Sequence, residues 1–169
     1  ARGILSGYAN ADGTYCFHPT KNISRAEFAM ILARSAGADL TAYVGATAFL
    51  DVKASHWAAE SIVWASQQHI VYGVGNSNYA PDANISRQDM AVMILRFAQA
   101  EAIELPASAT AITFADQSAV PIYAADAVET MQRAGIINGI VSSGKTYFKG
   151  AACASRAEAA KMISYLLAL

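Results

Sequence analysis

The chain has 169 residues, of which 54% are apolar, so it is long enough to bury a hydrophobic core as one domain or as a close cluster of repeats. Its formal net charge of −1 disfavours an extended surface for binding nucleic acid. No apolar run reaches the roughly 18 residues that a membrane-spanning helix needs, so no transmembrane segment is predicted.

Apolar residues recur at helical spacing in five stretches, and these are predicted to be helices. In chain order they cover residues 24–36, a stretch from 55 or 56 to 69, and residues 86–100, 121–134 and 155–167. Residues 39–47 and 106–110 are predicted linkers. Short aromatic pieces before the first, third and fifth helices are extended at most. The predicted fold class is therefore all-α with long structured loops.

One four-residue motif opens three of these helices: a serine, an arginine, a variable residue and an acidic residue. The copies are Ser24-Arg25-Ala26-Glu27, Ser86-Arg87-Gln88-Asp89 and Ser155-Arg156-Ala157-Glu158. The two copies that carry Glu match a capping box, in which the serine side chain and the Glu side chain each accept a backbone N–H of the other residue. Helix capping is the favoured interpretation of the serines, with ligand contact second.

The arginine of each motif occupies a position that the helix dipole disfavours. A cation in the first turn faces the positive end of the dipole, which costs about a few tenths of a kcal/mol. Three arginines at the same place therefore predict that each has an anionic partner. That partner is either a carboxylate of a neighbouring repeat, such as Asp51 or Asp116, or an acid group of a ligand.

The chain resembles itself with a period of about 65 residues. Gly7, Gly73 and Gly139 each end a similar apolar phrase, and they lie 66 residues apart. We expect a partial repeat at residues 1–40 and full repeats at residues 47–105 and 112–169, together forming one compact domain. The beginning of the first repeat is expected to lie outside this chain.

The ordered motifs of the second repeat resemble the S-layer homology (SLH) domain. The matching residues are Phe49, Asp51, His56-Trp57-Ala58, Ile70, Gly73, Tyr79, Pro81-Asp82 and Ile85-Ser86-Arg87. The resemblance implies a pseudo-threefold cluster of helix-loop-helix repeats, here with an incomplete first repeat. It also implies an extracellular module on a bacterial cell wall, which anchors a surface protein non-covalently by binding secondary cell wall polysaccharide that carries pyruvate ketals.

The residues and the resemblance together give a set of candidate ligand-binding residues. They are Arg25, Arg87, Arg156, Asp51, Trp57, Gly73, Asp116 and Tyr123. A guanidinium group can bind the ketal carboxylate through paired hydrogen bonds, beside the free N–H groups of a helix start. The aspartates would accept hydrogen bonds from sugar hydroxyls, and an aromatic ring would cover the sugar. The two aromatic residues also fit core packing, and the glycine also fits a turn with positive φ.

Other kinds of site are not expected. The sequence has no nucleophile motif, no paired catalytic carboxylates and no phosphate loop, so we predict no enzyme and no catalytic residue. The histidines lack partners at metal spacing, and no metal or cofactor is predicted. Cys16 and Cys153 fit either one disulfide or two buried thiols. The predicted partner is an acidic wall polysaccharide. The alternative is a structural module of a surface layer that contacts protein neighbours without binding glycan.

Overall fold

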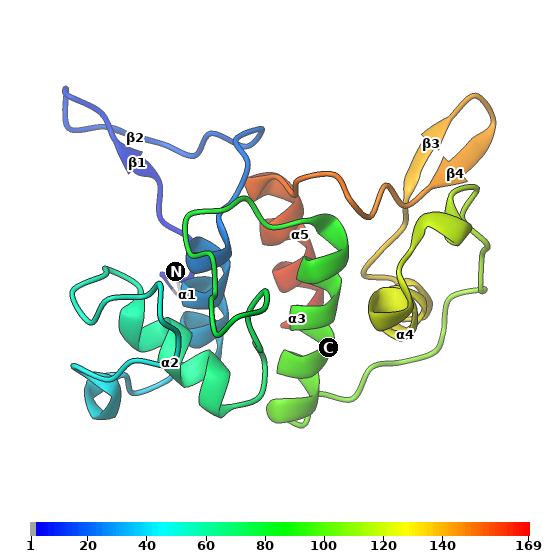
Figure 1. Cartoon of the computed structure of the whole chain (residues 1–169). Helices are drawn as coiled ribbons and strands as arrows, with labels where there is room; N and C mark the ends of the chain where they lie inside the picture. The colour runs from blue at the N-terminus through cyan, green and yellow to red at the C-terminus, as the bar shows by residue number, and fades with distance from the viewer. Residues whose placement is uncertain (1–2) are drawn as a thin grey trace.

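The computed structural model describes residues 3–169, and this part of the chain contains five α-helices and two small antiparallel hairpins (Figure 1). The helices are α1 (Arg25–Ala36), α2 (Ala59–Gln67), α3 (Arg87–Ala100), α4 (Ile122–Arg133) and α5 (Arg156–Leu166). One hairpin pairs β1 (Tyr8–Ala9) with β2 (Tyr15–Cys16), and the other pairs β3 (Ile140–Ser142) with β4 (Lys145–Tyr147). Two short 3₁₀ helices are η1 (Thr41–Tyr43) and η2 (Gln117–Ala119). The prediction of a mostly helical chain with structured loops is confirmed, but all-α is wrong because of the hairpins.

The starts of α1, α3 and α5 follow the capping pattern of the sequence. In α1, the Ser24 hydroxyl accepts the N–H of Glu27 at 3.1 Å, and the Glu27 carboxylate accepts the N–H of Ser24 at 2.9 Å. The same reciprocal pair opens α5. In α3 only the serine bond forms. Gly37, with φ of 65°, ends α1 as predicted.

The helices α2 and α4 begin later than the apolar spacing predicts. The segment 56–58 forms a turn in which the N–H of Ala58 donates to His56 Nδ1 at 3.2 Å, and α2 starts only at Ala59. Trp57 therefore lies outside the helix. Pro121 precedes α4 with an extended ψ of 153°, so it is the cap residue and not a member of the first turn.

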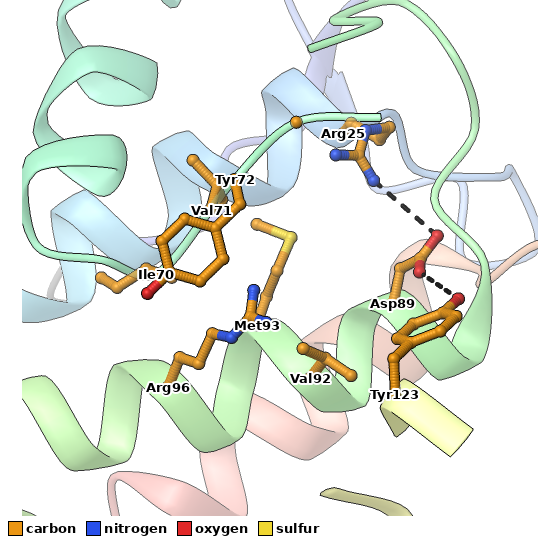
Figure 2. Close-up of a pocket in the computed structure, with 10 residues that line it drawn as sticks. Arg25, Ile70, Val71, Tyr72, Asp89, Val92, Met93, Arg96 and Tyr123 are labelled. Atoms are coloured by element: carbon orange, nitrogen blue, oxygen red, sulfur yellow. Dashed lines mark hydrogen bonds and ion pairs between the residues drawn. The ribbon is translucent and has the colours of Figure 1, made fainter. Parts of the chain in front are cut away.

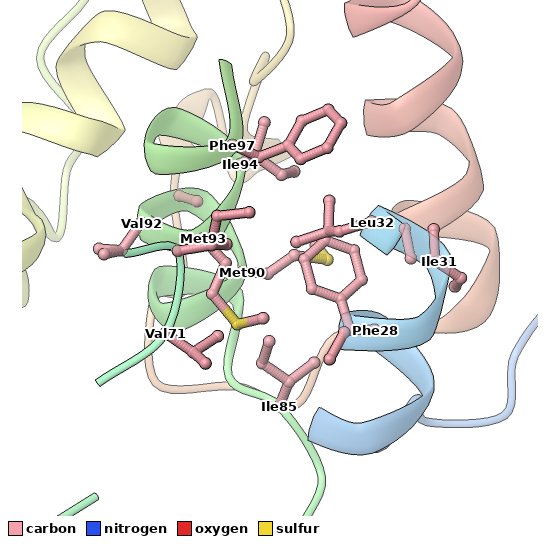
Figure 3. Close-up of a cluster of buried hydrophobic side chains, with 14 of the residues drawn as sticks. Phe28, Ile31, Leu32, Val71, Ile85, Met90, Val92, Met93, Ile94 and Phe97 are labelled. Carbon is pink, nitrogen blue, oxygen red and sulfur yellow. The ribbon is translucent and has the colours of Figure 1, made fainter. Parts of the chain in front are cut away.

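The core lies where α1, α3 and α5 meet (Figure 3). Phe28 and Leu32 of α1 face Met90, Ile94 and Phe97 of α3, and all five side chains are buried. Helix α2 packs on α1, and α4 packs on α3. The core placement predicted for Phe28, Trp64 and Phe97 is confirmed, as they are 0%, 5% and 1% exposed.

The loops before α1, α3 and α5 are joined by a closed ring of three backbone hydrogen bonds. The N–H of Ile23 donates to the carbonyl of Ala154, that of Ala154 to Ile85, and that of Ile85 to Ile23, at 2.9–3.0 Å. All three residues are fully buried. Each loop also accepts the first two helix amides of its neighbour: Arg25 and Ala26 in α1 donate to the carbonyls of residues 83 and 81. The corresponding bonds in α3 and α5 have lengths of 2.9–3.0 Å.

These loop contacts overturn one expectation. The first amides of α1, α3 and α5 are already bonded to protein carbonyls or to the capping serine, so the helix starts offer no free N–H groups to an anion. The short aromatic segments 17–19, 79–81 and 148–150 have instead a structural role, because the carbonyls of Pro19, Pro81 and Gly150 accept hydrogen bonds from backbone N–H groups of a neighbouring helix.

Gly73 and Gly139 mark equivalent tight turns, with φ of 82° and 70°. A Cβ at Gly73 would lie 2.4 Å from the carbonyl oxygen of Asn78 and 2.8 Å from the ring of Phe49. Close approach of another backbone therefore accompanies the positive φ. Gly7 differs, because its φ is not in the left-handed region.

Every helix within residues 3–169 is too short or too polar to cross a lipid bilayer. The same residues contain no cluster of three His, Cys, Asp or Glu side chains placed to hold a metal ion. Cys16 and Cys153 are both free thiols. Cys153 is exposed, so neither a disulfide nor a pair of buried thiols describes them.

Candidate functional site

Three pockets lie beside the three motif arginines, and each is lined by residues of more than one repeat. The Arg25 groove, of about 220 Å³, is formed by Arg25, residues 70–73, Asp89, Val92, Met93, Arg96 and Tyr123 (Figure 2). The Arg156 groove, of about 160 Å³, is formed by Arg156, residues 4–8, Glu27, Met30, Ile31, Arg34 and Trp57. The Arg87 groove, of about 100 Å³, is formed by Arg87, residues 136–140, Glu158, Lys161 and Met162.

Arg25 is held by groups of the second repeat. Its Nε donates to the carbonyl of Tyr79 at 2.8 Å, and its guanidinium carbon lies 4.8 Å from the centre of the Tyr79 ring. One terminal nitrogen lies 3.7 Å from Oδ2 of Asp89, which occupies the third position of α3. The Arg25 side chain is only 9% exposed. Its charge is thus compensated inside the protein while its edge still lines the groove.

The other two motif arginines make equivalent contacts. Arg87 donates from Nε to the carbonyl of Phe148 at 2.9 Å and pairs with Glu158 at the start of α5. Arg156 donates from Nε to the carbonyl of Phe17 at 3.0 Å and lies 3.7 Å from Glu27 at the start of α1. The three pairs therefore link each of these helices to the next and close on themselves.

The predicted anionic partner of each arginine is confirmed, but its proposed identity is wrong. The partner is the acidic residue that ends the motif in the neighbouring repeat, not Asp51 or Asp116. The electrostatic cost of a cation in the first turn is offset by an acid in the first turn of the next helix, whose own position the dipole favours.

Asp51 and Asp116 hold loops instead of arginines. The two carboxylate oxygens of Asp51 accept the N–H groups of Tyr79 and Ala80 at 2.8 and 2.7 Å. Asp116 accepts those of Phe148 and Lys149 at the same distances. Neither aspartate lines one of the three grooves. Their link to the candidate site is indirect, because Tyr79 and Phe148 are the residues whose carbonyls bind the motif arginines.

Replacing Asp51 by Asn is expected to lower the free energy of unfolding by about 1–2 kcal/mol. The amide has one acceptor oxygen where the carboxylate has two, so one of the two backbone N–H groups loses its charge-assisted bond. Urea denaturation monitored by circular dichroism measures the change. Asp126→Asn is the matched control, because Asp126 is exposed. An equal effect in the two variants would refute the loop-holding role.

The same loop contact predicts an acid dependence of stability. Burial raises the pKa of Asp51, but the N–H groups of Tyr79 and Ala80 outweigh it, so the pKa lies below its ordinary value. A carboxyl group with a lowered folded-state pKa stabilises the protein above the unfolded pKa, about 4, and this contribution is lost as the pH falls through the folded pKa. Below about pH 4, the free energy of unfolding should therefore fall less steeply with decreasing pH in Asp51→Asn than in the unsubstituted chain.

The aromatic candidates Trp57 and Tyr123 lie at the rims of two grooves. Trp57 lines the Arg156 groove and is 55% exposed, so the core-packing alternative does not describe it. Tyr123 lines the Arg25 groove and is 54% exposed. Its hydroxyl donates to Asp89 at 2.8 Å and accepts from Gln88 at 2.9 Å. Burial and the bond to Asp89 raise the pKa of Tyr123.

The groove residues that the sequence did not single out include Tyr72, Arg34 and Arg96. Tyr72 precedes Gly73 and is 63% exposed at the edge of the Arg25 groove. Arg34 and Arg96 each follow the acidic residue of their motif by seven positions, which is two helical turns. That shared spacing was the available signal, but it is hidden among ordinary charged positions on a helix surface.

One family model matches three segments of the chain. The model of the S-layer homology domain matches residues 1–29, 48–91 and 113–160, which make up more than half of the chain. The chain belongs to the S-layer homology domain family.

Three curated relatives illustrate where such segments occur. The chain is 38% identical over 97 residues to cell surface glycoprotein 1 of Acetivibrio thermocellus. The aligned region covers 57% of this chain and 4% of that protein. It is 34% identical over 96 residues to the cellulosome-anchoring protein of the same organism, covering 56% and 21%. It is 33% identical over 151 residues to an endoglucanase of Bacillus sp. strain KSM-635, covering 89% and 15%.

The chain thus spans a small part of each relative's length. A location at the bacterial cell surface, as predicted from the sequence, is consistent with the family and with these names.

Proposed function

We propose that the chain is a non-covalent anchoring module, which holds a surface protein on a bacterial envelope by binding acidic secondary cell wall polysaccharide. The observation that carries the proposal is the recurrence of one kind of groove beside each motif arginine, built each time from at least two repeats. The recognised group is proposed to be the carboxylate of a pyruvate ketal, which is rigidly fixed to its sugar and suits a preformed pocket.

The repeats are inferred to be arranged about a pseudo-threefold axis, with units at residues 1–40, 47–105 and 112–169. The closed ring of backbone bonds and the three cyclic ion pairs support this arrangement. A repetitive polysaccharide could then occupy more than one groove, so that weak sites reinforce one another through high effective concentration.

Each candidate residue has a proposed role in this binding. Arg25, with its counterparts Arg87 and Arg156, forms the base of a groove and fixes the acidic residue of the neighbouring helix. Gly73 lets the loop approach closely enough to form the wall. Tyr123 and Trp57 offer flat faces to a sugar ring. Asp51 and Asp116 have an indirect role, because they hold the loops whose carbonyls bind the arginines.

One specific observation favours a second function. All three motif arginines are internal struts, paired with the protein's own carboxylates. That is what a structural module requires if it contacts protein neighbours in a surface layer and binds no glycan. The two functions differ in one measurable property, which is binding of the purified polysaccharide.

Cosedimentation tests the proposal directly. The chain should sediment with isolated cell wall material that retains its secondary polysaccharide and remain in the supernatant with bare peptidoglycan. Chemical removal of the pyruvate ketals should release at least about 90% of the bound chain, since it removes the charged group on which we expect affinity to depend. Retention that is unchanged after depyruvylation would contradict the pyruvate assignment. Absence of binding to any polysaccharide would favour the structural alternative.

A further inference from the structure

The charges within the Arg25 groove do not balance. Arg25 and Asp89 form a pair and cancel, which leaves Arg96 as the remaining charge of the lining. Among residues 3–169, no carboxylate lies within ion-pair distance of Arg96 and its guanidinium makes no hydrogen bond. Figure 2 shows Arg96 and Tyr72 at one end of the pocket, and Arg25, Asp89 and Tyr123 at the other.

Arg96 is positioned without being neutralised. Its guanidinium carbon lies 4.4 Å from the centre of the Tyr72 ring, so the planar group rests on an aromatic face. This stacking orients the guanidinium but leaves its N–H edges free for a planar anion. A ligand carboxylate bound there would meet a full positive charge, whereas at Arg25 it would compete with Asp89.

The first repeat has an arginine at the equivalent position in the Arg156 groove, although this arginine does not stack on an aromatic ring of the residues that the structure describes. Arg34 stands seven residues after Glu27, as Arg96 stands seven after Asp89, so both lie on the same helix face as their acidic residue. Arg34 is exposed and lines the same groove as the Arg156–Glu27 pair. In the described part of the chain it has no acidic partner within ion-pair distance.

The third repeat has no arginine at the equivalent position. Seven residues after Glu158 stands Tyr165, and the cation of the Arg87 groove is Lys161, one turn earlier. An ammonium group cannot form the paired bonds that a guanidinium forms with a carboxylate. The described lining of this groove also includes no aromatic residue such as Tyr123 or Trp57, and its volume is the smallest of the three.

We propose that Arg34 and Arg96, and not the motif arginines, are the groups that bind the ligand carboxylate, so that the Arg156 and Arg25 grooves are competent and the Arg87 groove is not. This inference rests on the proposed function and names the residues that determine its specificity. The ligand chemistry is a carboxylate fixed on a pyranose ring, with the ring placed against Tyr123 or Trp57. A pyruvate ketal and a uronic acid both present such a group.

Isothermal titration calorimetry of the intact chain separates these sources. The two probes are a methyl hexopyranoside bearing a pyruvate ketal and the methyl glycoside of a uronic acid. The unsubstituted chain should bind the ketal at two sites, and Arg96→Gln or Arg34→Gln should leave one. The double variant should lose at least about tenfold in affinity, which is what removal of one charge-assisted pair gives. Thermal denaturation should show folded variants, since neither side chain has an internal ion pair.

Two further variants complete the test. Lys161→Gln and Arg133→Gln should bind like the unsubstituted chain, because the first lies in the excluded groove and the second lies outside all three. Unchanged binding by the double variant, or loss in Lys161→Gln, would overturn this inference while leaving the proposed function intact. Binding of the uronic acid alone, with loss in the double variant, would support the two arginines and overturn the pyruvate assignment. No binding of either probe would overturn both.

Discussion

Replacing Arg156 by Ala is expected to destabilise the chain by about 3–5 kcal/mol, the usual cost of removing one member of a buried ion pair. Arg156 is the most extensively bonded of the motif arginines. It donates to the carbonyls of Ser6 at 2.6 Å and of Phe17 at 3.0 Å, in addition to facing Glu27. Its removal leaves these acceptors without a donor in a place where the arginine side chain is only 5% exposed.

Urea denaturation of the variant measures this loss, with Arg133→Ala as the matched control. Arg133 is 46% exposed and pairs with Glu129 one helical turn away. An exposed pair of this kind contributes little, so the control should change stability by no more than about 0.5 kcal/mol. A second comparison isolates the charge: Arg156→Met combined with Glu27→Gln should be more stable than Arg156→Met alone. Equal losses at Arg156 and Arg133 would contradict the strut role.

Replacing Gly73 by Ala is the second substitution with a large expected effect, about 3 kcal/mol or more. The φ of 82° already strains a residue with a Cβ. The added methyl group would also meet the carbonyl oxygen of Asn78 at 2.4 Å, and a backbone atom cannot move aside as a side chain does. Because Gly73 lines the Arg25 groove, glycan binding should fall together with stability.

The matched control for this substitution is Gly135→Ala. Gly135 has a similar φ of 73°, but a Cβ there would meet nothing within 4 Å. Only the conformational cost remains, which is about 1–2 kcal/mol. The difference between the two variants in thermal or chemical denaturation therefore measures the clash itself. If both lose the same amount, the close approach of the Asn78 loop is not a constraint on the turn.

Local signals in the sequence predicted the helices well. The capping motifs at Ser24 and Ser155 and the stop at Gly37 act within a few residues, so they are readable without knowing the fold. The hairpins were missed because their strands have only two or three residues, too short for any alternation of polar and apolar side chains. The late start of α2 was missed because His56 accepts a backbone N–H that apolar spacing does not reveal.

The arginine partners show where sequence reasoning reached its limit. The charge argument predicted an anion beside each motif arginine, and this was right. The identity of the anion could not be deduced, because Arg156 and Glu27 lie about three quarters of the chain length apart in the sequence. Asp51 was an attractive choice by position, yet its oxygens are occupied by backbone N–H groups. The ligand-binding role of the eight candidate residues stays a prediction. Arg34 and Arg96 are recognisable as candidates only from the pockets that they line.

The ring of bonds through Ile23, Ile85 and Ala154 bears on how the chain folds. Linear repeat proteins gain stability one neighbour at a time, so a piece of the array can fold before the rest. Here the loop before α1 must meet the loop before α5 for the N–H groups of Ile23, Arg156 and Ala157 to find their acceptors. The loop before α5, which is synthesised last, is therefore needed to complete the hydrogen bonds of the loop before α1. Such long-range closure favours slow, all-or-none folding, and it leaves no single repeat able to stand as an independent unit.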